Sequence, residues 1–65
     1  MNLLINEVQD GGKLIVLSDG SKWAVDIVDS IHSALWIPMD KVEVSSSKLT
    51  NLSRSNKAVR VERKY

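Results

Sequence analysis

Short apolar runs alternate with turn-forming residues along most of the chain. β-Branched and other apolar residues dominate each run, and the runs recur about every 8–12 residues, a spacing typical of a small all-β domain. No window shows the sustained i, i+3, i+4 apolar spacing of an amphipathic helix. Seven segments are therefore predicted as strands: residues 3–8, 13–18, 21–28, 34–37, 41–45, 48–52 and 57–63.

These segments predict an all-β fold, a small SH3-like barrel of about five to six short antiparallel strands that forms one domain over residues 1–65. Ile15 and Leu17 make their strand apolar on both faces, as expected of a strand between two layers of a barrel. In the last strand, Val59 and Val61 are predicted to face the core. The side chains predicted to face solvent are Ala58, Arg60, Glu62 and Lys64.

The segment LSDGSKWAV, residues 17–25, is predicted to form a hairpin corner. Its Asp-Gly dipeptide at 19–20 is the composition that a two-residue type I′ turn needs, because both central residues then have positive φ. The register that follows places Val16 opposite Trp23. We therefore expect Trp23 to be a core anchor on the same face as Val16 and Val25.

The tryptophan motifs also resemble a known pattern. The parts that carry the resemblance are LSDGSKWAV at 17–25, Asp29, WIPMD at 36–40 followed by Val42 and Val44, and LTNL at 49–52. Together they resemble uncharacterised small bacterial proteins with an L-x-DGS-x-W-x-V hairpin and a W-x-x-x-D-x-V-x-V segment, over about residues 12–61. The resemblance implies an SH3-like or related small barrel and no activity. That group commonly has glycine where Met39 stands.

The sequence carries no pattern typical of an enzyme. Asp26, Asp29 and His32 recur every three residues, but in a strand this spacing points successive side chains to opposite faces, so no metal site is predicted. Phosphate-binding glycine motifs and a G-x-S-x-G nucleophile turn are absent. We therefore expect a non-enzymatic protein with no cofactor, no metal and no small-molecule substrate.

Trp36 and Pro38 are the first candidate binding residues. In an alternating strand, Trp36 would lie on the face opposite Leu35 and Ile37, which predicts partial exposure. Packing in the core stays open as an alternative for Trp36. We expect the Trp36-Pro38 corner, or an unpaired strand edge, to contact a protein partner or a second copy of the chain.

Charge is distributed unevenly, although the net charge is +1. Residues 1–44 hold seven acidic and three basic residues, whereas residues 45–65 hold six basic and one acidic. The two parts could attract each other within one barrel. Alternatively, the basic strands could bind nucleic acid, with affinity that falls steeply with salt; the candidate residues are Arg54, Lys57, Arg60, Arg63 and Lys64.

Composition predicts a cytoplasmic protein that does not contact a membrane. The first residues hold only three consecutive apolar side chains after Asn2, too few for a signal peptide or a membrane span. The chain contains no cysteine, which suits a reducing compartment. A chain of 65 residues buries only about 60% of its unfolded surface, so dense packing or oligomerisation has to stabilise it.

Overall fold

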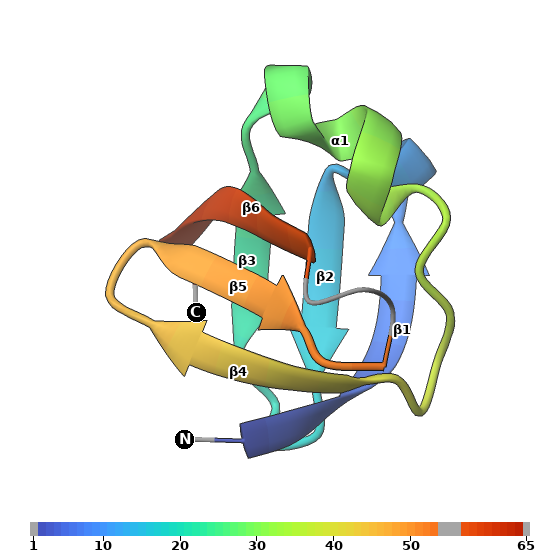
Figure 1. The fold of residues 1–65 in the computed structure, drawn as a ribbon, viewed down its shortest axis with the longest axis vertical. Helices are drawn as coiled ribbons and strands as arrows, with labels where there is room; N and C mark the ends of the chain where they lie inside the picture. Colours follow the sequence, from blue (N-terminus) through green and yellow to red (C-terminus); the bar gives the residue numbers. More distant parts are fainter. Residues whose placement is uncertain (1, 54–56, 65) are drawn as a thin grey trace.

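Six antiparallel strands close into a barrel in this computed structural model, which describes residues 2–53 and 57–64 (Figure 1). The elements in chain order are β1 (Asn2–Gln9), the 3-10 turn η1 (Asp10–Gly12), β2 (Leu14–Leu17), β3 (Lys22–Val25), α1 (Ile27–Ser33), β4 (Lys41–Ser45), β5 (Lys48–Asn51) and β6 (Lys57–Arg63). The strands follow one another around the barrel as β1, β2, β3, β6, β5 and β4. The prediction of a small all-β barrel is confirmed.

Each of the six described strands pairs with two neighbours. The first half of β1 pairs with β4 and its second half with β2, so β1 closes the barrel. The expectation that an unpaired strand edge binds a partner is therefore wrong, because closure uses the backbone groups of both edges.

The barrel interior is filled by alternate residues of the strands. Val59 and Val61 are buried while Ala58 and Arg60 are exposed, which confirms the faces predicted for β6. The complete buried cluster consists of Ile5, Ile15, Leu17, Trp23, Val25, Trp36, Val42, Leu49, Val59 and Val61.

The hairpin between β2 and β3 differs from its prediction by one residue in register. Ile15, not Val16, lies opposite Trp23. The loop has three residues, because the Leu17 amide bonds to the Ser21 carbonyl at 2.9 Å, and only Gly20 of the Asp-Gly pair has positive φ, at 88°. A three-residue loop with glycine in the left-handed region is the next most common hairpin connection after the primed turns. This register buries Ile15 and Leu17 beside Trp23.

Asp19 and Ser21, the polar residues near Trp23, form hydrogen bonds that lead to its indole. The Trp23 indole donates to the Ser21 hydroxyl at 2.8 Å, and that hydroxyl donates to Asp19. Hydrogen bonds from the Ser21 hydroxyl and amide lower the pKa of Asp19 below its ordinary value. This chain of bonds satisfies the buried indole N–H, so the DGS-x-W motif serves folding.

The connection from β3 to β4 is helical. The predicted strand at 21–28 is confirmed over Lys22–Val25 and wrong beyond it, and the predicted strand at 34–37 is wrong. β3 ends at Val25, and Asp26 caps α1 by accepting a hydrogen bond from the Val28 amide at 3.0 Å. The backbone stays helical through Ala34. The cap and the contacts of α1 with η1 outweigh the weak helix propensity of its β-branched residues.

Met39 lies in a strained backbone conformation. Residues 37–40 form a turn in which the Asp40 amide bonds to the Ile37 carbonyl, with Pro38 at the second position and Met39 third at φ 77°. This is the pattern of a type II turn, whose third position favours glycine.

Met39→Gly is expected to raise the free energy of unfolding by about 0.5–1 kcal/mol. Relief of the left-handed conformation contributes about 1–2 kcal/mol, and the greater freedom of glycine in the unfolded chain removes about 0.5–1 kcal/mol. The Met39 side chain is exposed, so its loss removes little packing. Urea denaturation measures the change, with Met39→Ala as the control that keeps the strain. Equal stabilities of the two variants would contradict the assignment of strain.

Candidate functional site

α1 presents its apolar side chains to solvent and its serines to the barrel. Ser30 and Ser33 are buried, whereas Ile27, Val28 and Ile31 are each at least 70% exposed. An ordinary surface helix has the opposite arrangement, with its apolar side against the core. The apolar surface continues beyond the helix. We name the whole set the apolar ridge; its members are Ile27, Val28, Ile31, Leu35, Ile37 and Met39.

Close packing against η1 holds α1 in this orientation. The Ser33 hydroxyl donates to the Gly12 carbonyl at 2.6 Å, and the Ser30 hydroxyl donates to the Ile27 carbonyl at 2.8 Å. A Cβ at Gly12 would lie only 2.4 Å from the Ala34 nitrogen, so only glycine permits this approach. Small residues therefore attach the helix to the barrel, and the large ones face away from it.

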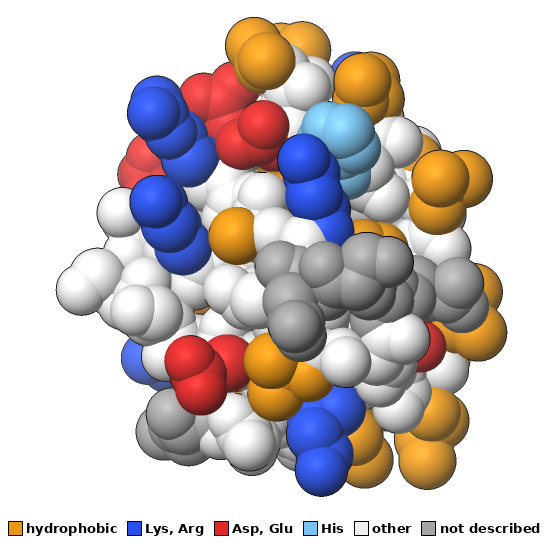
Figure 2. Space-filling view, viewed as in Figure 1, with side chains coloured by type: hydrophobic (Ala, Val, Ile, Leu, Met, Phe, Trp, Pro, Cys, Tyr) orange, Lys and Arg blue, Asp and Glu red, His pale blue; other side chains and the backbone are white. Residues whose placement is uncertain are grey.

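Groups of apolar side chains lie along one end and one side of the molecule (Figure 2). Figure 2 shows hydrophobic side chains gathered along the top and right margins, where Figure 1 places α1 and the connection to β4. The six ridge side chains are between 51 and 76% exposed. Isolated exposed apolar side chains are common, so six of them within residues 27–39 make this segment a candidate interaction surface.

The ridge carries no basic residue. No lysine or arginine occurs between Lys22 and Lys41, and the acidic residues of α1 lie at its first turn. Asp26 caps the helix, and the Asp29 carboxylate accepts a hydrogen bond from the Arg60 amide at 3.0 Å. Residues 23–40 therefore bring no lysine or arginine to the ridge, and the first turn of α1 is acidic.

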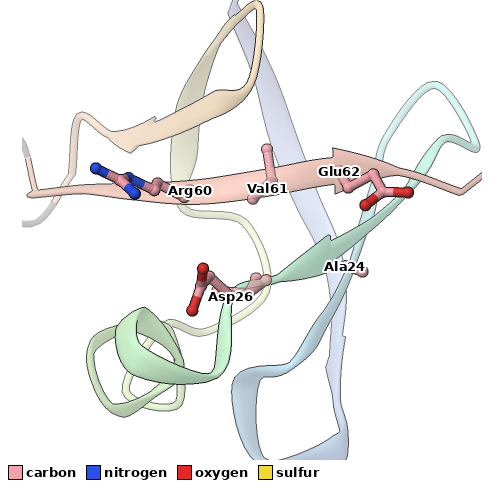
Figure 3. A pocket seen from close by; sticks show the side chains of 6 residues that line it. Ala24, Asp26, Arg60, Val61 and Glu62 are labelled. Atoms are coloured by element: carbon pink, nitrogen blue, oxygen red, sulfur yellow. The ribbon is translucent and has the colours of Figure 1, made fainter.

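A small polar hollow lies between β3 and β6, beside that acidic end. It has a volume of about 240 Å³, and its lining is Ala24, Val25, Asp26, Arg60, Val61 and Glu62 (Figure 3). Arg60 and Glu62 extend in opposite directions along β6, with Asp26 below them from the end of β3. Its charged lining mixes two carboxylates with one guanidinium. Among the described residues, no serine, histidine or lysine lines it.

Trp36 lies in the core, and the expectation that it is partly exposed is wrong. Its side chain is 4% exposed and belongs to the buried cluster. α1 replaces the predicted strand there, so strand alternation does not apply to this segment. Pro38 is exposed in the turn that leads to β4. The Trp36-Pro38 corner thus offers only Pro38 at the surface, next to the ridge residues Ile37 and Met39.

The basic candidate residues are spread over β6 among acidic ones. Lys57, Arg60, Arg63 and Lys64 are exposed, and Arg54 lies outside the described residues. Arg60 lies opposite Lys48 of β5, and the Arg60 backbone amide donates a hydrogen bond to the Asp29 carboxylate. The Arg63 guanidinium lies over the Trp23 ring, 5.8 Å from its centre. Figure 2 shows acidic side chains between the basic ones on that face, and nucleic-acid binding through these residues stays a prediction.

The described residues hold neither a group of metal-ligand side chains nor a helix that could span a membrane. Across residues 2–53 and 57–64, no three histidine or acidic side chains are grouped so that they could hold a metal ion. Within the same ranges, α1 is too short to cross a membrane, and no other helix has the length and apolar character to do so.

Comparisons with known proteins found no match. No protein-family model matches the chain, and neither curated proteins nor solved structures gave a significant match. The resemblance to the small bacterial proteins therefore stays a resemblance.

The sequence contains a signal for the ridge that the strand prediction concealed. Ile27, Ile31 and Leu35 recur every four residues, which is helical spacing, and Asp26 immediately precedes them as a capping residue. Ser30 and Ser33 then mark the opposite side of the same helix. The segment could have been predicted as a short helix, although its inverted orientation depends on the contact with Gly12.

Proposed function

We propose that this protein is a non-enzymatic, SH3-like binding or scaffolding module that acts through protein–protein contacts made by the apolar ridge. The observation that carries the proposal is the inverted helix, with buried serines and six large apolar side chains left in solvent from Ile27 to Met39. Exposure of these side chains is unfavourable in the free protein. Burial of one such side chain in an interface contributes about 1.5–3 kcal/mol.

The closed barrel supports the proposal that the partner contacts the ridge and not a strand edge. Because all six strands are paired on both sides, strand addition at an edge has no place to occur on the described barrel. The ridge is the alternative that the fold offers. A helix with an exposed apolar side binds by packing that side against an apolar surface of its partner.

The proposal includes a cytoplasmic location, since a chain without cysteine suits a reducing compartment. Nucleic-acid binding by Lys57, Arg60, Arg63 and Lys64 remains the alternative function. Exposed Glu62 lies between Arg60 and Arg63 on β6 and interrupts the continuous positive potential that phosphate binding uses.

Photocrosslinking tests the proposed contact. A photoreactive amino acid at Ile31, the middle of the ridge, is expected to give discrete protein adducts on irradiation of cells that produce the protein naturally. Ile31 is 70% exposed, so the replacement leaves the barrel folded, which circular dichroism checks. The matched control carries the same group at Glu43, which is exposed on β4. Absence of adducts at Ile31, or the same adducts from both positions, would contradict the proposal.

A further inference from the structure

We infer that the ridge binds a second copy of this chain, in an antiparallel helix-to-helix contact on a twofold axis that passes beside Ile31. This inference rests on the proposed function and names its partner. A twofold contact is isologous, which means that the same surface on both copies must be complementary to itself. The spacing and the charge of the ridge both meet this condition.

The spacing of the large side chains is symmetric about Ile31. Ile27 lies four residues before it in α1, and Leu35 lies four residues after it in the turn that follows α1; all three are at least 70% exposed. In an antiparallel pair centred on Ile31, this residue packs against its own copy. Ile27 of each copy then packs against Leu35 of the other. The three side chains thus form a continuous apolar seam of the kind that short helix pairs use.

The charges of α1 favour the antiparallel arrangement. Asp26 and Asp29 lie at the first turn and His32 lies in the last turn. A parallel pair would bring the carboxylates of the two copies together. An antiparallel pair instead places the acidic end of each helix beside the His32 end of the other. No lysine or arginine between Lys22 and Lys41 opposes close approach of two identical surfaces.

Other partners fit the ridge less well. A helix that lies on a membrane surface typically carries lysine and arginine on its polar side, and α1 carries neither.

A single introduced cysteine tests the twofold axis, because the chain has none of its own. Facing Cα atoms of two helices whose axes are about 8–10 Å apart come within the range of a disulfide, about 4.4–6.8 Å. Under mild oxidation, Ile31→Cys is therefore expected to form a covalent dimer of twice the 7.3 kDa chain mass. The exposed control Glu43→Cys is expected to form it at least ~10-fold more slowly, since it meets its copy only by random collision.

Sedimentation equilibrium tests the association without a covalent bond. The wild-type chain is expected to sediment as a dimer that dissociates on dilution, and Ile31→Asp is expected to raise the dissociation constant at least ~10-fold. Unchanged circular dichroism of Ile31→Asp at low concentration would show that the barrel is intact. A wild-type chain that stays at 7.3 kDa throughout, or equal oxidation rates at the two cysteine positions, overturns the inference.

The crosslinking experiment separates failure of this inference from failure of the proposed function. Adducts from Ile31 at twice the chain mass support the second copy. Adducts of other masses alone leave the proposed function standing and show that the partner is a different protein. Absence of any adduct removes both.

Discussion

Trp36→Ala is expected to lower the free energy of unfolding by about 3–5 kcal/mol, the cost of truncating a large aromatic side chain in a core. Trp36 is 4% exposed and packs in the buried cluster of a barrel that has only ten such residues among those described. A domain of this length has a total stability of roughly 3–10 kcal/mol. The variant should therefore be unfolded, or close to unfolding, near room temperature. Urea denaturation followed by circular dichroism measures the loss of stability.

Leu35→Ala is the matched control for Trp36→Ala. Leu35 is adjacent in sequence but 73% exposed, so its truncation is expected to change the free energy of unfolding by less than about 0.5 kcal/mol in dilute, monomeric protein. The same substitution should weaken dimerisation, because Leu35 belongs to the ridge. A loss below about 1 kcal/mol for Trp36→Ala would be typical of exposed sites. It would show that the Trp36 side chain lies at the surface and would restore it as a candidate contact residue.

Gly12→Ala is expected to cost about 2–5 kcal/mol and to displace α1 from the barrel. The backbone at Gly12 has φ 93°, which costs an L-residue about 1–2 kcal/mol. The added Cβ would also lie 2.4 Å from the Ala34 nitrogen and 2.9 Å from the Ser30 carbonyl, and overpacking of this kind costs about 1–3 kcal/mol. Urea denaturation measures the loss, and if the inferred dimer forms, a change in its dissociation constant also reports the displaced helix.

Gly20→Ala separates the cost of positive φ at Gly12 from the cost of overpacking by the added Cβ. Gly20 has nearly the same φ, 88°, but open space where a Cβ would lie. Its replacement is therefore expected to cost only the conformational part, about 1–2 kcal/mol. If the two variants lose the same stability, the close approach of α1 to Gly12 is not a tight contact in solution.

The sequence predicted the barrel because its strongest signal is the spacing of short β-branched runs. The alternation around Val59 and Val61 is unambiguous, and the structure follows it. The β2–β3 register was wrong for a physical reason. A two-residue and a three-residue loop both place Gly20 at positive φ, and four consecutive apolar residues, 14–17, give no alternation to choose between them.

The candidate site was missed because local propensity and tertiary contact favour different structures at residues 27–37. Ile27, Val28 and Ile31 have β propensity, but Asp26 starts a helix and Gly12 lets that helix dock through its serines. The contact with Gly12 joins residues more than twenty positions apart, so no sequence window contains it. The same error assigned Trp36 to a strand and predicted its exposure.

Because α1 is attached to the barrel through serines, α1 is expected to unfold locally before the barrel does. The barrel strands are held by a shared apolar core and by paired backbones on both sides, whereas α1 is held by a few polar contacts and one close approach to Gly12. Segments with little buried apolar surface open without global unfolding. Amide hydrogens of α1 should therefore exchange with solvent long before those of the barrel, and association through the ridge would slow that exchange. The element proposed to make the contact is thus also the one expected to gain most order from it.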